Sequence, residues 1–220
     1  SLDALRTERP TLQILHDPFP AWPLLGIHPA EFNNDLQAAI ADPRAREPFN
    51  NISPEDWLRV QAQYANAAQH IRLAAPSAAA ADLLSGLVPE LDRDDITVIP
   101  HGLPIRVPAR KAVGRAQPRL TSEKPQLRIL IPGRVQPGKG VALLEAALPE
   151  LRALAHITLL GTGKGGEAFF GYSGVNVIQQ YDQSQLAGLI EVLQPDLAVL
   201  PSVVPETFSY TLSEMWALGV

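Results

Sequence analysis

Two carboxylates near the end of the chain have the spacing of ligand-binding groups. Glu206 directly precedes an apolar-periodic run, and Glu214 lies eight residues later within it. Residues 196–200 are predicted to form a short buried strand, so the order is strand, acidic loop and acidic helix. Ligands bind open α/β sheets at the carboxyl ends of strands, and eight residues are just over two helical turns, so both acids can reach one ligand. The structural alternative is that Glu206 favours the helix dipole and Glu214 sits on a solvated face.

A glycine-rich segment with two cations, residues 133–140, also follows a predicted strand and opens a predicted helix. Backbone amides and the dipole at such a helix start favour an anion. Arg134 can bind two phosphate oxygens at once, and Lys139 supplies a point charge. The spacing also resembles a P-loop, but Gly140 stands where that loop needs Ser or Thr for magnesium. Asp196 precedes its predicted strand, whereas a P-loop acid follows one. Two solvated side chains beside a turn are the structural alternative.

Other candidates also follow predicted strands. Gly161 and Gly163 come directly after one strand, where glycines let the backbone approach a ligand closely. His16 ends another strand, and its alternative is an ordinary surface histidine. His101 follows a third strand and is at most a residue that lines a cleft. The histidines show no metal-ligand spacing, so no metal site is predicted.

These segments, in this order, resemble the nucleotide-sugar site of retaining GT-B glycosyltransferases, with family 4 the closest match. The motif is an acid, seven residues and a second acid, with Pro205 before the first acid and Ala-Leu-Gly closing the helix. The resemblance is good over residues 127–220 and looser over 12–102. It implies an α/β chain of GT-B type, with two Rossmann-like domains that have parallel sheets. We expect a partial amino-terminal, acceptor-side domain (1–105), a linker (106–126) and a nucleotide-sugar-binding domain (127–220), with the chain being a fragment at both ends.

The resemblance further implies a hexosyltransferase-type enzyme of polysaccharide biosynthesis. It would move a sugar, with retention, from a nucleotide-diphosphate donor to a glycan or lipid-linked glycan acceptor, with no obligatory cofactor or metal. Arg134 and Lys139 would stabilise the leaving diphosphate, and Glu206 would position the transferred sugar. Glu214 would accept hydrogen bonds from the ribose, and His16 would lie near the donor sugar and the acceptor.

Five further positions complete the expected donor site. The family has Gly-x-Gly where Gly161 and Gly163 stand. Thr207, Phe208 and Ser209 fall in the turn whose amides would meet phosphate or sugar, although the family more often has Gly at the position of Ser209. Three alternatives remain open: a magnesium-dependent P-loop NTPase, a GT-B epimerase or phosphorylase, and a non-catalytic fragment that binds a nucleotide sugar.

Composition agrees with a globular protein. The chain has 46% hydrophobic residues, a net charge of −5 and no cysteine. An acidic balance argues against a nucleic-acid surface, and the absence of cysteine fits a reducing compartment. No apolar run approaches the roughly 18 residues of a membrane span. We therefore expect a cytoplasmic protein, with peripheral contact at the inner face of the membrane as a further option.

Periodicity predicts the elements that position these residues. Helices are expected at 31–41 and 54–70, and a third helix is expected to be capped by Ser77 and stopped by Gly86. From residue 127 onward, strands and helices alternate regularly, which predicts a parallel sheet with helices on both faces.

Overall fold

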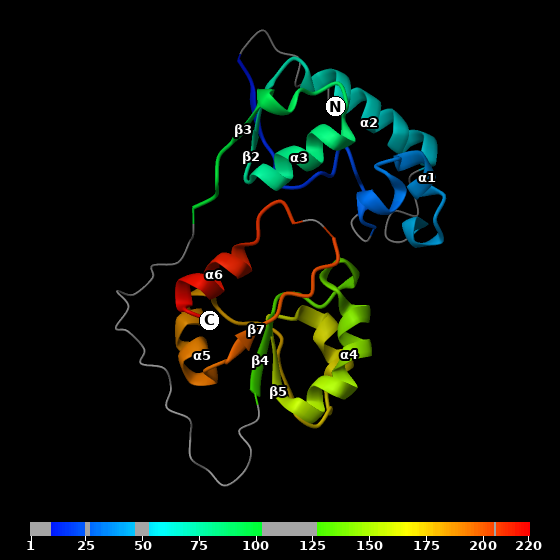
Figure 1. Cartoon of the computed structure of the whole chain (residues 1–220). Coiled ribbons are helices and arrows are strands. Elements are labelled where there is room, and N and C mark those ends of the chain that lie inside the picture. The colour runs from blue at the N-terminus through cyan, green and yellow to red at the C-terminus, as the bar shows by residue number, and fades with distance from the viewer. Residues whose placement is uncertain (1–9, 25–26, 47–52, 103–126, 205) are drawn as a thin grey trace. The chain divides into compact units, whose positions relative to one another are not determined.

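The computed structural model describes residues 10–24, 27–46, 53–102, 127–204 and 206–220. The chain divides into two compact units. Unit 1 comprises Ser1–Gly102 and Val203–Phe208, and unit 2 comprises Leu103–Ser202 and Ser209–Val220. Each unit is built on its own sheet of parallel strands, so the fold is α/β with two parallel sheets (Figure 1). The predicted linker at 106–126 lies outside the described residues.

The strands are β1 (Leu12–Ile14), β2 (Arg72–Ala75), β3 (Ile96–Val98), β4 (Leu127–Pro132), β5 (Ala155–Leu160), β6 (Val175–Ile178) and β7 (Leu197–Ala198). The α-helices are α1 (Leu36–Ile40), α2 (Pro54–Ala68), α3 (Ala78–Leu87), α4 (Val141–Leu154), α5 (Leu186–Leu193) and α6 (Tyr210–Leu218).

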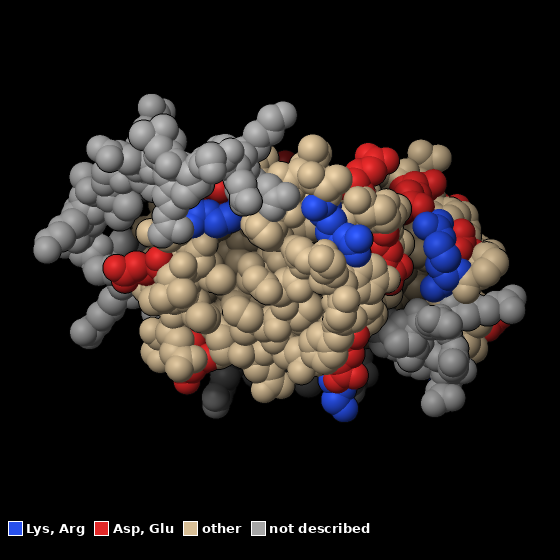
Figure 2. Space-filling model, turned by 90° about the horizontal axis from the view of Figure 1, so that it is seen from below, with Lys and Arg blue, Asp and Glu red and all other residues tan. Residues whose placement is uncertain are grey.

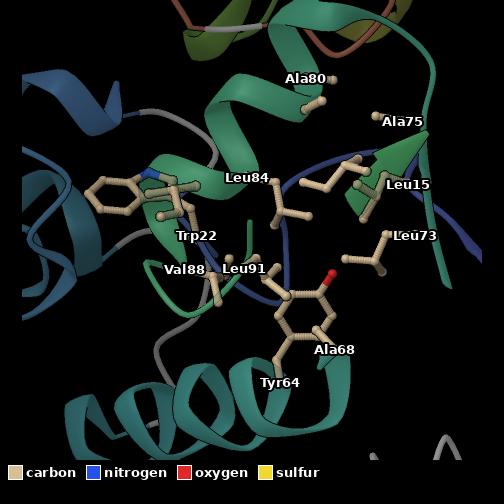
Figure 3. Packing of buried hydrophobic residues seen from close by; sticks show 14 of the residues in the cluster. Leu15, Trp22, Tyr64, Ala68, Leu73, Ala75, Ala80, Leu84, Val88 and Leu91 are labelled. Carbon is tan, nitrogen blue, oxygen red and sulfur yellow. The ribbon is translucent and has the colours of Figure 1, made fainter. Parts of the chain in front are cut away.

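Unit 1 has its helices packed on one face of the sheet β1-β2-β3. Figure 3 shows Tyr64 of α2 and Leu84 of α3 pointing toward Leu73 of β2, all within one buried cluster. On β1 the alternate side chains Leu12 and Ile14 remain 53% and 50% exposed. Among the described residues, unit 1 is therefore a two-layer structure with a partly exposed apolar sheet face.

The helix predicted at 31–41 is broken in the structure. A 3₁₀ turn at Pro29–Phe32 is followed by the short helix α1. Asn33 and Asn34 between them have φ of 52° and 64°, the left-handed conformation that Asn tolerates better than most residues. Asp35 then caps α1 by accepting a hydrogen bond from the amide of Ala38. The single-helix prediction was wrong because apolar spacing does not report these turn residues.

Helix α3 begins as predicted, because the hydroxyl of Ser77 accepts a hydrogen bond from the amide of Ala80 at 3.1 Å. It does not stop at Gly86, which lies inside the helix. A Cβ on Gly86 would lie 3.2 Å from the side-chain nitrogen of Asn34, which donates to the carbonyl of Gly86. This glycine therefore allows a close tertiary contact and does not end the helix.

Unit 2 has three layers, as the alternation of strands and helices predicted. Ile129 and Ile131 of β4 pack on one face of the sheet with α4, whereas Leu130 packs on the other with α5 and α6. The strand order is β6-β5-β4-β7. In chain order this is 3-2-1-4, which matches the first four strands of the doubly wound dinucleotide-binding arrangement.

Candidate functional site

The direction of the chain reverses across the sheet of unit 2 between β4 and β7. From β4 the chain moves outward through β5 and β6, and it then returns to β7 on the other side of β4. Ligands of open α/β sheets bind at the carboxyl ends of the two strands that flank such a switch point. Arg134 follows β4, and the segment that leads into α6 follows β7. Two of the predicted site segments therefore leave the sheet on either side of the switch point.

The loop after β4 is held to the end of β5 by two backbone hydrogen bonds. Gly133 donates to Leu160 at 2.8 Å, and Val135 donates to Thr162 at 3.1 Å. Arg134 between these two anchors is exposed, whereas Lys139 farther along is half-buried. The segment Pro137–Lys139 forms a 3₁₀ turn, and α4 begins after it at Val141. The guanidinium thus extends from a fixed backbone toward solvent.

Gly140 joins this loop to α4 and lies against the chain that follows β7. Its φ is +76°, and a Cβ built on it would lie only 1.9 Å from the carbonyl oxygen of Pro201. Only glycine fits a position with both constraints. The close approach brings the start of α4 against the end of β7, directly at the switch point.

The glycines after β5 are explained by contacts within unit 2. A Cβ on Gly161 would lie 2.9 Å from the ring of Tyr181, and the φ of Gly161 is +77°. A Cβ on Gly165 would lie 2.1 Å from the carbonyl oxygen of Val135, and a Cβ on Gly166 would lie 2.0 Å from the hydroxyl of Thr162. Gly161 was predicted to let the backbone approach a ligand, but the group that approaches it here is Tyr181.

Gly163 differs from these three glycines. It has a φ of +61°, and a Cβ on it would meet no atom within 4 Å among the contacts of the described chain. Its backbone amide donates to the carbonyl of Gln179 at 3.0 Å. The space beside Gly163 is therefore the part of this loop that is consistent with a ligand contact.

Glu214 lies in α6 and is only 6% exposed. One of its carboxylate oxygens accepts a hydrogen bond from the side-chain amide of Gln183 at 2.6 Å. Burial raises the pKa of Glu214, and the hydrogen bond from Gln183 opposes that rise. The solvated-face alternative for this residue is wrong. Burial of one carboxylate with a single amide partner is costly, which is typical of a group kept for binding.

Two neighbours of Glu214 were not identified from the sequence. Gln183 and Tyr181 both follow β6, and burial together with the charge of Glu214 raises the pKa of Tyr181. The signal that points to them is their position, since they follow the third parallel strand at the same sheet edge as the predicted site residues.

The other predicted site residues, apart from Ser209, belong to unit 1. His16 follows β1 and is exposed, and its ring stacks on that of His101 with centroids 5.6 Å apart. The ring of Phe208 meets His101 edge-on at 5.3 Å. The hydroxyl of Thr207 donates to the carbonyl of His16 at 2.5 Å. Glu206 is half-buried in the same unit.

Ser209 begins α6 and belongs to unit 2. Its hydroxyl accepts a hydrogen bond from the amide of Leu212 at 3.2 Å, so it is the N-cap of the helix. Serine at this position therefore has a structural role. The serine side chain stabilises the start of the helix that carries Glu214.

Charge is dispersed over the face of the molecule that Figure 2 shows. On the face shown in Figure 2, Lys and Arg are scattered among acidic side chains and are separated by uncharged area. Within the described ranges, no group of three or more His, Cys, Asp or Glu is arranged to hold a metal ion. No helix of the described chain is long and apolar enough to cross a membrane.

No model of a known protein family matches this chain, and no curated protein matches it.

Proposed function

We propose that this chain binds a nucleotide-diphosphate sugar in unit 2 and acts as a retaining glycosyltransferase of GT-B type. The acceptor is a glycan or a lipid-linked glycan. One observation supports the proposal most strongly. In the strand order β6-β5-β4-β7, the proposed phosphate-binding cations follow one strand of the switch point, and the helix with the proposed ribose-binding acid follows the other.

The chemistry assigned to the side chains is what the resemblance to retaining GT-B glycosyltransferases implies. The bond between the anomeric carbon and the diphosphate oxygen breaks, and a bond to the acceptor hydroxyl oxygen forms on the same face of the sugar. Arg134 and Lys139 stabilise the charge that develops on the leaving diphosphate. The acceptor proton passes to that diphosphate. Glu214 accepts hydrogen bonds from the ribose, and Glu206 positions the sugar hydroxyls.

The P-loop alternative receives less support from the structure. Asp196 directly precedes β7. Its carboxylate accepts a hydrogen bond from the backbone amide of Arg128 at 2.8 Å and pairs with the guanidinium of Arg128 at 3.5 Å. This pairing, at the amino end of the strands, lowers the pKa of Asp196. Gly140, at the position of the magnesium-binding hydroxyl, is packed on Pro201. Both residues have structural roles that explain their presence.

A binding screen tests the proposal. The intact chain is titrated with UDP, GDP and dTDP and with a sugar ester of each, with magnesium and with excess chelator. We expect one base to be preferred and binding to survive the chelator, because two cations occupy the position where a metal would neutralise the diphosphate. An absolute magnesium requirement would favour the P-loop class, and the absence of nucleotide binding would overturn the proposal.

A non-catalytic binding module is the second candidate, and turnover separates it from the enzyme. Release of free nucleoside diphosphate from the preferred sugar donor, with and without added glycan, measures transfer and hydrolysis together. Tight donor binding with no release under either condition would favour the binding module.

A further inference from the structure

Residues 207 and 208 are packed against the sheet of unit 1, although they are covalently flanked by unit 2 on the carboxyl side. The carbonyl of Thr207 accepts a hydrogen bond from the hydroxyl of Ser77 at 2.7 Å. Thr207 in turn donates its own hydroxyl to the carbonyl of His16 at 2.5 Å. Phe208 packs edge-on against His101. Ser209, the next residue, belongs to unit 2.

Each of these contacts comes from a different strand of the parallel sheet. His16 follows β1, Ser77 follows β2 and His101 follows β3. The carboxyl edge of the whole sheet of unit 1 therefore binds this dipeptide. Two of the contacts are hydrogen bonds, which individually contribute little net stability, so they favour the docked conformation without making it irreversible.

Ser77 has two functions at this edge. Its hydroxyl oxygen accepts from the amide of Ala80 to cap α3, and its hydroxyl hydrogen is donated to Thr207. A serine hydroxyl has one donor and two acceptor positions, so both bonds are made together. The cap requires only an acceptor, whereas the bond to Thr207 requires a donor.

We propose that Ser77 is a positioning residue, whose hydroxyl docks Thr207 and Phe208 on unit 1 and thereby fixes the place of the adjacent acid Glu206. The docked dipeptide follows Glu206 directly in the chain, so the hydrogen bonds of Thr207 restrict the backbone next to the acid. The consequence for sugar binding rests on the proposed function, whereas the docking does not. Glu206 belongs to unit 1 together with the docked dipeptide.

Two substitutions separate docking from helix capping. Ser77→Asp retains an acceptor that caps α3, but its ionised carboxylate has no proton to donate to the carbonyl of Thr207. Ser77→Thr retains both the acceptor and the donor. Ser85→Ala is the matched control, because Ser85 lies in the same helix and its hydroxyl bonds only to the carbonyl of Asp82 among the contacts of the described chain.

Chymotrypsin cleavage after Phe208 in the intact chain measures release, since proteolysis follows the population of the open form. Cleavage after Phe170, which is 54% exposed in unit 2, serves as the internal reference. We expect Ser77→Asp to accelerate cleavage after Phe208 roughly five- to tenfold, the effect of one lost hydrogen bond. Ser77→Thr and Ser85→Ala should cleave at the parental rate. Parental cleavage in Ser77→Asp, or equal acceleration in Ser77→Thr, would overturn the docking proposal.

Titration of the same variants tests the consequence for the acid. UDP and UDP-glucose, or the corresponding pair of the preferred base, are the probes. We expect Ser77→Asp to weaken the sugar-bearing ligand severalfold and to leave the free diphosphate unchanged. Equal affinities of Ser77→Asp and the parent for both ligands would overturn the positioning of Glu206. If the parent binds neither ligand, the proposed function fails, and cleavage alone still decides the docking.

Discussion

Because Glu214 is buried, the free energy of unfolding of unit 2 should depend on whether this residue is ionised. Among the described residues, its carboxylate has the side-chain amide of Gln183 as its hydrogen-bond partner, and Glu214 is otherwise largely shielded from solvent. Burial raises the pKa of Glu214 above its ordinary value of 4.5. A carboxylate in this state is held in place without full hydration, and a ribose hydroxyl pair would supply the missing donors.

Substitution of Glu214 should change the pH dependence of stability. The raised folded pKa means that, as the pH rises, the unfolded chain loses this proton before the folded chain does. The contribution of protonated Glu214 to the free energy of unfolding is thus fully present below the pKa of this residue in the unfolded chain. It is lost as the pH rises through the pKa of this residue in the folded chain. Glu214→Gln cannot ionise, so this decline should disappear. Urea midpoints of the parent and the variant, measured from about pH 4 to about pH 8, test this. Parallel curves would show that the ionised carboxylate costs nothing.

Lys139 gives a prediction about binding. If its ammonium contacts diphosphate, Lys139→Ala should weaken binding of the nucleoside diphosphate by about 1.5–3 kcal/mol, the worth of a charge-assisted hydrogen bond. Unfolding should change little. Lys164, which is exposed on the glycine-rich loop, provides the matched control as Lys164→Ala. Equal affinities of Lys139→Ala and the parent would remove Lys139 from the site.

Tyr64 gives a prediction about the core of unit 1. Its side chain is fully buried, its hydroxyl has no hydrogen-bond partner among the described residues, and burial raises its pKa to about 12. Tyr64→Phe removes the unsatisfied hydroxyl and retains the ring, so unit 1 should be stabilised by up to about 1 kcal/mol. Denaturation followed by tryptophan fluorescence in a Trp216→Phe background reports on Trp22 and Trp57 of unit 1. Destabilisation by 1 kcal/mol or more would reveal a partner for the hydroxyl, such as a buried water.

Helix α4 lies close to the chain after β7, at the switch point of unit 2, because residue 140 is a glycine. Gly140 ends the loop after β4, caps the start of α4 and contacts Pro201 after β7. A side chain at this position would push α4 away from β7. The backbone geometry of the proposed phosphate site therefore depends on the contact between these two elements.

Gly140→Ala should accordingly destabilise unit 2 by more than about 2 kcal/mol, because it adds both a clash and an unfavourable φ. Gly188 in α5 is the matched control, since a Cβ there would meet no atom within 4 Å. Gly188→Ala should stabilise the same unit by about 0.5–1 kcal/mol, since alanine is the better helix former. Chemical denaturation followed by circular dichroism compares the two. Similar effects of both substitutions would show that α4 can shift freely.

At the scale of the whole molecule, the two acids of the motif are divided between the units. Glu206 belongs to unit 1, and Glu214 belongs to unit 2. The chain passes between the units at Ser202 and again at Phe208, so α6 is joined to β7 through residues that pack in unit 1. Under the proposed function, we expect the two carboxylates to respond to different parts of the ligand.

Glutamine substitutions distinguish the roles of the acids. Glu214→Gln should weaken the free nucleoside diphosphate and the sugar donor alike, because both contain the ribose. Glu206→Gln should spare the free diphosphate and weaken only the sugar donor by about 1–3 kcal/mol, the value of a hydrogen bond to a charged group. Titration of both variants with both ligands decides the question. Equal losses for the two ligands in Glu206→Gln would contradict the assigned role.

Local sequence patterns determined the elements and the strand-helix order. The alternation of strands and helices from residue 127 onward predicted the parallel sheet of unit 2 with helices on both faces, and the residue type of Ser77 predicted the cap of α3. The parallel sheet of unit 1 was expected only from the family resemblance. The same local patterns predicted that Arg134 and Lys139 follow one strand, which is β4, and that Glu214 lies in the helix after another, which is β7. They missed the break at Asn33 and misread Gly86, where a turn conformation and a tertiary contact outweighed periodicity.

Tertiary structure alone decided what the site residues contact. No local signal indicates that the ring of Tyr181 fills the space beside Gly161, that Gln183 bonds to Glu214, or that Thr207 docks on Ser77. These contacts join residues far apart in the chain, and they form only when parallel strands bring their carboxyl ends to one edge. The sequence therefore determined which groups are available for chemistry, and the packing of the sheets determined which of them are already engaged within the protein.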